Sequence, residues 1–593
     1  STGFKKKFIE FFIYYGAENI DDKFENEQEY LEYLQSNPFY TLNGDYVKSF
    51  GELSIANFLY SNGIPYLYEE IYKRGTKDSH MPDFYIQNTN IWIEYFGLDR
   101  KGNTRKDINK GKYKNEMEWK RTTHKRNNTN LIEIFFYDII EGTWEDKLKE
   151  QLRNYDIKFT RKSDNEIYNQ LKKVQITEYS KLVHRFLDLD KAKLKKKGPS
   201  NARQLQFMKL YNDIKIKYEE SLGNDIDFND MINQAKDHLD NNSFTHKFKY
   251  IIVDEFQDIS MSDCKFLKSL LSSSDISSED NSPSKTKIYC VGDDWQSIFG
   301  FRGAEPNLMR DFHNHFDSSS SDSTMDDFNS NSSTRPLHIY EVFDFSSSNT
   351  TMVQLDMTFR FDSSINDVSS RFLMKNPNQI PKKLVTYKKS DNPSVFLHWI
   401  EPMSIEDTLI KWVEKYSNHK EYKSKNLLVL FRYNKDSQNE KYRFSEKLHL
   451  KIKQLWGNGR KVRYRSLHSS KGHEEDVVLI IGIEGSKREV RRGSFPTGYK
   501  DDEILSMVLE KYDDFPFSEE RRLLYVGMTR AKFHLHLLCD FIDRSPFSDE
   551  LATYPNINIV KSSKFSKRVC PACKLGSLRN VKKETNSKPY YLC

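Results

Sequence analysis

The stretch Tyr250–Ser260, which reads YIIVDEFQDIS, restricts the fold more than any other part of the chain. Its first four residues are apolar and mostly β-branched, which predicts a fully buried strand of a parallel sheet. The run stops at Asp254 and Glu255, two adjacent carboxylates. Because the carboxyl ends of parallel strands line the ligand crevice of an open α/β sheet, we expect both side chains at a substrate site. An Asp there can hold Mg²⁺, and a Glu can orient or deprotonate a water molecule.

A second short apolar run, Ile288–Val291, predicts another buried strand. It is followed by GDDWQSIFGFRGA, which brings Gln296, Phe299, Phe301 and Arg302 to the same edge of the sheet. Further along the chain, strand-like runs at 427–430, 477–481 and 533–538 alternate with helical segments. This alternation predicts a second parallel sheet.

Length and charge limit the class of protein. A chain of 593 residues should hold several domains. Its net charge of +6 is a weak indication of nucleic-acid binding, so a polyanion site must be a local groove. Six cysteines argue against a disulfide framework and for a reducing compartment. No apolar run is long enough to span a bilayer, so we expect a soluble, cytoplasmic protein without a membrane partner.

Residues 46–140 form a distinct unit with a helix that carries Glu52, followed by two predicted strands joined by a turn: MPDFYI with Asp83 and IWIEYFG with Glu94. The pattern resembles the PD-(D/E)xK nuclease fold, in which three such acids gather a divalent metal. The lysine expected two residues after the last acid is Phe96 here, and Lys120 on a following helix is a candidate replacement. Because a lysine stabilises the attacked phosphate, the alternative is a nuclease-shaped domain used only for DNA contact or packing.

The basic C-terminal tail contains Cys570 and Cys573 in a CPAC turn and ends at Cys593. A CxxC turn in a basic surround predicts half of a zinc ribbon, with these three cysteines as Zn²⁺ ligands. A redox-active CxxC is the alternative, although no thioredoxin-like βαβ pattern surrounds it.

Five segments, two of them described above, occur in a characteristic order: DEFQD, VGDDWQSIFGFRGA, LDMTFR, SLHSSKGHE and RRLLYVGMTRA. They resemble motifs II to VI of the UvrD-like superfamily 1 DNA helicases. The nuclease-like insertion and the zinc-ribbon tail resemble the helicase IV-like branch of that family. The resemblance implies an α/β fold with two RecA-like parallel-sheet motor domains, an inserted restriction-endonuclease-like domain, a helical subdomain and a C-terminal zinc-ribbon fragment.

The resemblance also implies roles for single residues. Asp254 would hold Mg²⁺, Glu255 would activate the water that attacks ATP, and Gln296 would sense the γ-phosphate. Arg360 and Arg530 would be arginine fingers, and Glu474 would contact the ribose. The residues implied in single-stranded DNA binding are Phe299, Phe301, Arg302 and His468.

Two departures from the family are large. Only about thirty residues (435–464) separate Asn434 from the strand before SLHSSKGHE, so the regulatory subdomain that many relatives insert there is missing or minimal. The phosphate loop GxxxxGK[ST] also does not occur in the chain. The chain begins with Ser1 rather than Met, and the zinc ribbon is unfinished, so we expect sequence missing at both ends. The expected consequence is that the 593-residue chain binds single-stranded DNA in a salt-dependent way without hydrolysing ATP.

The domains expected on this basis are a helical remnant of the first motor half, the nuclease-like insertion, a helical subdomain, RecA-like domain 1, RecA-like domain 2, and a linker with a partial zinc ribbon. Their ranges are 1–45, 46–140, 141–245, 246–334, 335–545 and 546–593.

The function implied is an ATP-dependent 3′→5′ DNA helicase of repair or recombination. It would act on single-stranded and partly duplex DNA and belong to the bacterial nucleoid. The alternative is a DNA-binding or nuclease module that a degenerate motor positions on DNA.

Overall fold

The computed structural model describes most of the chain, and its parts fall into two compact units. The ranges described are 2–14, 39–104, 110–174, 176–192, 197–274, 286–316, 351–390, 392–400, 405–432, 446–457, 459–483, 495–496, 501–509, 513, 515–541, 544–561, 579–581 and 590–592. Unit 1 contains residues 1–191, 195–226 and 500–509, and unit 2 contains residues 192–194, 227–499 and 510–593. None of the helices in these ranges combines the length and apolarity that a bilayer crossing requires.

Unit 1 has a mixed four-stranded sheet in the order β3-β4-β5-β6. β3, β4 and β5 are antiparallel neighbours, and β5 and β6 are parallel. The strands are β3 (Tyr66–Tyr68), β4 (Phe84–Ile86), β5 (Ile91–Phe96) and β6 (Asn130–Phe135). The two strands predicted around Asp83 and Glu94 are therefore present, and every residue of β5 is buried.

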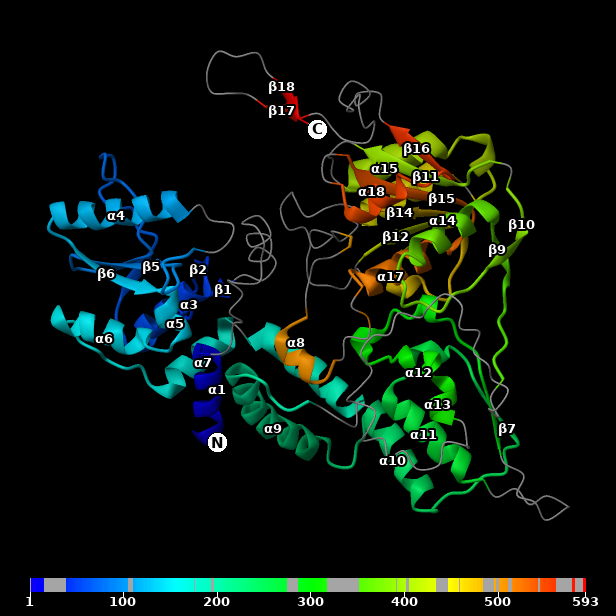
Figure 1. Ribbon diagram of the computed structural model, residues 1–593, viewed down its shortest axis with the longest axis horizontal. Coiled ribbons are helices and arrows are strands. Elements are labelled where there is room, and N and C mark those ends of the chain that lie inside the picture. The colour runs from blue at the N-terminus through cyan, green and yellow to red at the C-terminus, as the bar shows by residue number, and fades with distance from the viewer. Residues whose placement is uncertain are drawn as a thin grey trace. The chain divides into compact units, whose positions relative to one another are not determined.

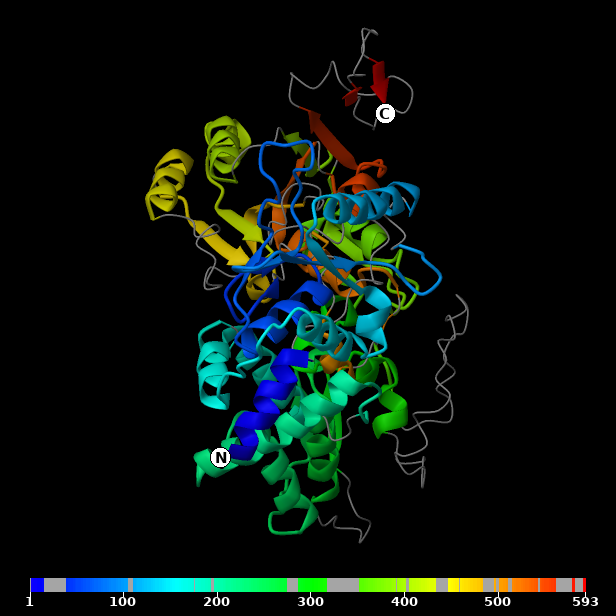
Figure 2. The same cartoon turned by 90° about the vertical axis from the view of Figure 1, so that its left-hand side faces the viewer.

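Helices cover both faces of this sheet (Figures 1 and 2). Alternate residues of β5 face opposite ways: Ile93 packs with α3 (Phe50–Ser61) and α6 (Trp144–Asn154), and Phe96 packs with α4 (Lys110–Arg126). Ser49 caps the N-terminus of α3: its side chain accepts a hydrogen bond from the backbone N–H of Glu52 and so satisfies one free donor of the first turn. The short elements β1 (Phe39–Tyr40), β2 (Tyr46–Val47) and α5 (Phe136–Ile140) complete this part of the unit.

The second core of unit 1 is helical. It brings together α1 (Thr2–Tyr14), α7 (Asp164–Val174), α8 (Ile176–Ala192), α9 (Ala202–Leu222) and the 3₁₀ turn η8 (Glu503–Met507). The helix predicted near the start of the chain is thus observed as α1. Buried Arg203 of α9 donates two hydrogen bonds to Asp502, of 2.6 Å and 2.8 Å, which fixes η8 against the helices.

Unit 2 is built around a six-stranded sheet with the order β13-β12-β14-β15-β11-β16, in which all neighbours are parallel. Its strands are β11 (Val395–Ile400), β12 (Leu427–Phe431), β13 (Val462–Ser466), β14 (Glu475–Ile480), β15 (Ala531–Asp540) and β16 (Ile557–Lys561). The second parallel sheet and its three predicted strand runs are confirmed.

Helices on both faces bury the six-stranded sheet (Figure 1). Leu479 belongs to the core formed with α15 (Ile405–Tyr416) and α16 (Glu446–Trp456). Ile480 belongs to the core formed with α14 (Ser363–Leu373), α17 (Ser518–Met528) and α18 (Pro546–Leu551). Trp295, from the GDDWQ segment, lies in that same core, so this segment is anchored to the six-stranded sheet.

The predicted strand at 250–253 is observed as β7 (Tyr250–Val253), and it pairs in parallel with β8 (Lys287–Cys290). The prediction that both strands are fully buried is wrong. Ile251 and Ile288 face the small core around Phe256, whereas the alternate side chains Ile252 and Tyr289 are 73% and 62% exposed. The physical reason is that the described sheet has only two strands and one covered face.

The remaining elements of unit 2 are short or flank these sheets. They are α10 (Phe228–Asp240), η1 (Phe256–Asp258), α11 (Met261–Ser272), η2 (Asp294–Gln296), η3 (Gly300–Arg302), α12 (Asn307–Arg310), α13 (Phe312–Phe316), β9 (Met357–Asp362), β10 (Val385–Lys388), η5 (Lys420–Tyr422), η7 (His468–Ser470), β17 (Arg579–Val581) and β18 (Tyr590–Leu592).

Candidate nucleotide site and nucleic-acid interface

The carboxylates Asp254 and Glu255 lie at the carboxyl end of β7, where the sequence predicts them. Asp254 is exposed, and its Oδ1 accepts a hydrogen bond of 2.9 Å from the backbone N–H of Glu255. Glu255 has a φ of 52°, in the left-handed region that non-glycine residues rarely occupy. Such strained conformations gather at functional sites, where surrounding contacts hold them.

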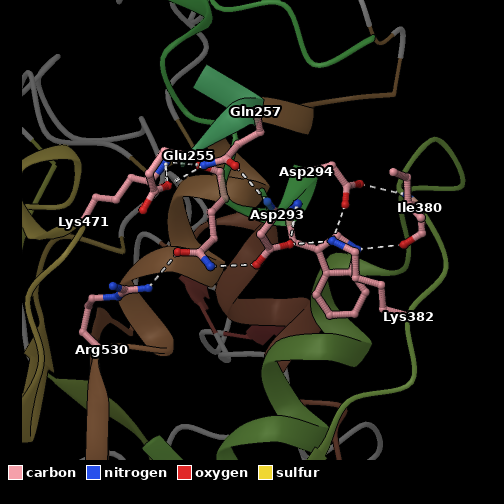
Figure 3. A network of polar contacts seen from close by, with 10 residues as sticks. Glu255, Gln257, Asp293, Asp294, Ile380, Lys382, Lys471 and Arg530 are labelled. Carbon is pink, nitrogen blue, oxygen red and sulfur yellow. Dashed lines mark hydrogen bonds and ion pairs between the residues drawn. The ribbon is translucent and has the colours of Figure 1, made fainter. Parts of the chain in front are cut away.

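Two amide side chains connect Glu255 with the segment after β8 (Figure 3). Gln257 donates 2.6 Å to Glu255 Oε2, and its own oxygen accepts 2.8 Å from the backbone N–H of Asp293. Asp293 Oδ2 in turn accepts a hydrogen bond of 2.7 Å from Gln296 Nε2. The ends of β7 and β8 therefore form one connected polar network.

Elements next to the six-stranded sheet complete the network from a second side. Arg530, which follows α17, donates from Nη2 to Gln296 Oε1 at 3.2 Å. Arg360 of β9 donates from Nε to Glu474 Oε2 at 2.7 Å, and Lys532 lies 2.8 Å from the other oxygen of Glu474. The structure thus brings Glu255, Gln296 and Arg530 together, with Arg360 and Glu474 forming a second pair.

The charges at the site shift the pKa values of its groups. Burial tends to raise the pKa of Glu255, but contacts from Lys471 and Gln257 outweigh that effect and hold the pKa below its ordinary value. Burial, and then the charge of Arg360, lower the pKa of Arg530 to about 10. Hydrogen bonding from Lys532, more than that from Arg360, holds the pKa of Glu474 low. All three groups stay charged at neutral pH, as binding of a polyphosphate and activation of water require.

Lys471 is a residue of the site to which the sequence assigned no role. Its Nζ lies 3.0 Å from Glu255 Oε2 and 2.5 Å from Asp258 Oδ2, and it donates to the backbone carbonyl of Gln296 at 3.2 Å. It stands in the segment SLHSSKGHE, so its position in a motif was the available signal. No feature of the sequence indicated that Lys471 would pair with Glu255, which lies far away along the chain.

The aromatic residues predicted to contact DNA form one cluster beside this network. The ring of Phe301 is 36% exposed and lies 6.0 Å from that of Phe299 and 5.3 Å from that of His468. The Arg302 guanidinium lies 5.5 Å and 5.6 Å from the two phenylalanine rings. Burial, followed by Arg432 and Arg302, lowers the pKa of His468 to about 4, so this ring is neutral at pH 7. The cluster offers π faces and a cation, as single-stranded DNA binding uses.

The candidate nuclease residues also lie near one another in unit 1. Lys120 Nζ lies 2.8 Å from Glu94 Oε1, Tyr68 donates 2.6 Å to Glu52, and Asp83 accepts 2.6 Å from the backbone N–H of Tyr95. Burial, and then the charges of Glu94 and Glu52, raise the pKa of Asp83 well above its usual range. Burial raises the pKa of Glu94 to about 7, against the opposing effect of Lys120.

Metal binding by these groups stays a prediction. Within the described residues, no group of three or more His, Cys, Asp or Glu side chains is arranged to hold a metal ion. Cys570, Cys573 and Cys593, the predicted zinc ligands, lie outside the described residues.

Parallel sheets that deliver acids and arginines to one polar network are what RecA-like helicase domains contain, and this mixed α/β chain fits that class. Residues 81–317 match the model of the UvrD/REP helicase N-terminal domain, and residues 444–539 match that of the UvrD-like helicase C-terminal domain. The first match begins inside the segment predicted as a nuclease-like insertion. The chain is therefore similar to UvrD-like helicases in both of these regions.

Individual proteins that are similar to this chain are also named as DNA helicases. DNA helicase IV of Escherichia coli is 30% identical over 329 residues, which are 55% of this chain and 39% of that protein. The ATP-dependent DNA helicase UvrD2 of Mycobacterium bovis is 38% identical over 76 residues, which are 13% of this chain and 9% of that protein. The chain thus matches about two fifths of the length of DNA helicase IV.

Proposed function

We propose that the chain belongs to an ATP-driven DNA helicase that moves 3′→5′ along single-stranded DNA in repair or recombination. The observation that carries the proposal is the position of Gln296, between Asp293 of the β8 end and Arg530 of the six-stranded sheet side. Because Gln296 contacts both Asp293 and Arg530, a change in a nucleotide bound beside it would affect both residues.

Each residue of the nucleotide site has a separate role in ATP hydrolysis. Glu255 is the general base for the attacking water, since it is ionised and stands at the exposed end of β7. Arg530 and Arg360 supply positive charge to the transferred phosphoryl group, and Glu474 orients the ribose. Asp254, an exposed carboxylate at the carboxyl end of β7, suits Mg²⁺, which proteins bind through one or two carboxylates plus substrate phosphates. Bound Mg²⁺ would neutralise phosphate charge.

The cluster of Phe299, Phe301, Arg302 and His468 is proposed as the base-stacking platform. Lys471 connects it to the nucleotide side, since its Nζ lies 5.4 Å from the Phe299 ring centre and 3.0 Å from Glu255. Stacking tolerates every base, and a protein that moves along DNA needs that tolerance.

The test measures phosphate release and strand separation by the full-length protein on duplexes with a 3′ or a 5′ single-stranded tail. We expect hydrolysis that depends on DNA and unwinding of the 3′-tailed duplex. Absence of DNA-stimulated hydrolysis would contradict the proposal, and unwinding only from the 5′ tail would contradict the direction.

A second candidate function rests on the buried acids of unit 1 with Lys120 paired to Glu94. A metal-dependent nuclease would use Glu52, Asp83 and Glu94 to hold the metal and Lys120 to stabilise the attacked phosphate. The test is a Mg²⁺-dependent nicking assay, with and without ATP, on the full-length protein and its Asp83→Ala/Glu94→Ala variant. Cleavage that is lost in the variant, with ATP hydrolysis retained, supports this function; cleavage that survives contradicts it.

The zinc ribbon is proposed on the three cysteines of the tail, Cys570, Cys573 and Cys593. Metal analysis of the full-length protein should find one Zn²⁺, and the Cys570→Ser/Cys573→Ser variant should lose it.

A further inference from the structure

Lys382 stands between α14 and β10, outside the five segments that resemble helicase motifs, yet it contacts Asp293 and Asp294 at one end of the polar network (Figure 3). Its Nζ donates to Asp293 Oδ1 at 2.5 Å and also to Asp294. The ammonium lies 5.3 Å from the centre of the Trp295 ring. The side chain is 14% exposed, so this lysine is mostly withdrawn from water.

Such a burial would be costly without the two carboxylates. Burial tends to lower the pKa of Lys382, and Asp293 and Asp294 outweigh it and raise the pKa above its ordinary value. Conversely, Asp294 is 5% exposed at its side chain and has Lys382 as its cation. Removing the lysine would leave two adjacent carboxylates with one of them buried, a costly arrangement that forces a rearrangement or protonation.

The backbone next to Lys382 is fixed to the same segment. The N–H of Ile380 donates 2.9 Å to Asp294 Oδ2, and the carbonyl of Ile380 accepts 2.9 Å from the indole N–H of Trp295. Trp295 is fully buried in the core of the six-stranded sheet. The backbone beside Lys382 is therefore held by Asp294 and by Trp295, which is packed in the core of the six-stranded sheet. These contacts set the position of Lys382 relative to Asp293.

The position of the Asp293 carboxylate determines how the side-chain amide of Gln296 is oriented. A carboxylate only accepts hydrogen bonds and a guanidinium only donates them. The Gln296 amide must therefore turn its nitrogen to Asp293 and its oxygen to Arg530, as observed at 2.7 Å and 3.2 Å. If Asp293 turned away, the amide would lose the contact that fixes its orientation.

We propose that Lys382 is a positioning residue for catalysis, which holds Asp293 so that the side-chain amide of Gln296 is oriented for the phosphate. The inference rests on the proposed function, because Gln296 must act on a bound nucleotide for its orientation to matter. Lys382 itself contacts neither nucleotide nor DNA in this assignment.

The test compares Lys382→Met in two backgrounds of the full-length protein, with Gln296 intact and with Gln296→Ala. In the intact background we expect DNA-stimulated kcat to fall about 10- to 100-fold, the size expected when a catalytic group is misplaced. In the Gln296→Ala background the same substitution should change kcat by less than about twofold, because no amide remains to be oriented. The matched control is Lys383→Met, the neighbouring and exposed lysine, which should leave kcat unchanged.

An equal loss of kcat in both backgrounds would overturn the inference, because Lys382 would then support the fold in general. Should the near-ultraviolet circular dichroism show that Lys382→Met is unfolded, Lys382→Arg replaces it in the same comparison. The guanidinium keeps the charge but changes the reach, so a smaller loss is expected that again vanishes with Gln296→Ala. A protein without DNA-stimulated ATP hydrolysis before any substitution would instead refute the proposed function itself.

Discussion

The two main parallel sheets of unit 2 place functional residues in different ways. The six-stranded sheet is covered on both faces, and β14 has its last four residues, Val477–Ile480, fully buried. The β7–β8 pair has one packed face and one exposed face, yet Asp254 and Glu255 stand at its end.

The difference shows how acids at the end of a small sheet are kept in place. Among the described residues, packing supports β7 from one side, through the core around Phe256. Glu255 is held by Gln257 and Lys471, and Asp293 by Lys382. The arginine side of the site depends more on burial, since Arg530 is 1% exposed and donates to backbone carbonyls of its surroundings. Polar contacts therefore hold the acidic side chains at the end of the small sheet, whereas burial in the core holds Arg530 beside the large sheet.

The largest expected effect comes from the acid of the small sheet. Glu255→Gln in the full-length protein should lower DNA-stimulated turnover by about 10²- to 10⁴-fold, because a general base is lost while the shape is kept. ATP and DNA binding should persist, as measured by equilibrium titration. Glu118→Gln, at a glutamate 64% exposed on α4, is the control that should retain turnover. Near-normal turnover in Glu255→Gln would contradict its role.

One substitution made in both sheets measures the packing difference directly. Ile480→Thr removes apolar volume and buries a hydroxyl in the large sheet, so it should lower the free energy of unfolding by about 2–4 kcal/mol. Ile252→Thr, at a side chain 73% exposed, should change it by no more than about 0.5 kcal/mol. Urea denaturation of the full-length protein and its two variants gives both values. A loss at Ile252 as large as at Ile480 would mean that the second face of β7 is covered in the full-length protein.

Acid should destabilise the large sheet through its buried histidines. His398 Nε2 lies 2.8 Å from His536 Nδ1, and Tyr422 lies 2.9 Å from His536 Nε2. Burial, and then Lys415, lower the pKa of His398 to about 3, and burial, followed by His398 and His534, lowers that of His536 well below 6.5. The unfolded chain therefore binds more protons than the folded one below about pH 6.5, and stability falls as the pH drops from there toward 3.

The slope should approach about 1.4 kcal/mol per pH unit for each such histidine. Urea midpoints between pH 7 and pH 5 measure it. His398→Gln, which removes one titrating ring, should reduce the slope, whereas His419→Gln, at a histidine 54% exposed, should leave it unchanged. An unchanged slope in His398→Gln would show that this ring is not neutral in the folded protein.

The smallest effect concerns the aromatic cluster after β8. Phe301→Ala should weaken binding of single-stranded DNA by about 1–3 kcal/mol, the usual contribution of one stacked base. Phe228→Ala, at an 84% exposed ring on α10, is the control that should bind DNA normally. Fluorescence anisotropy with a labelled oligonucleotide measures both, and equal affinities for the two variants would make Phe301 a packing residue.

The sequence by itself determined the elements and the order of the functional segments. Apolar runs bounded by turns located β7, β8, β12, β14 and β15, because short runs of apolar and β-branched residues favour strands. Asp254, Glu255, Gln296, Arg360 and Arg530 were singled out because they stand in segments that resemble helicase motifs, and their roles stay predictions.

Only the tertiary structure decided which of these residues meet and how deeply they are buried. The two-stranded β7–β8 sheet leaves Tyr250 and Ile252 exposed although their apolar run reads as core, because burial depends on what covers a face and not on the strand itself. Lys382 carries no local signal, since its partners Asp293 and Asp294 lie about ninety residues earlier in the chain. The pairing of Lys471 with Glu255 spans more than two hundred residues in the same way, and contacts of that kind exist only once the chain has folded.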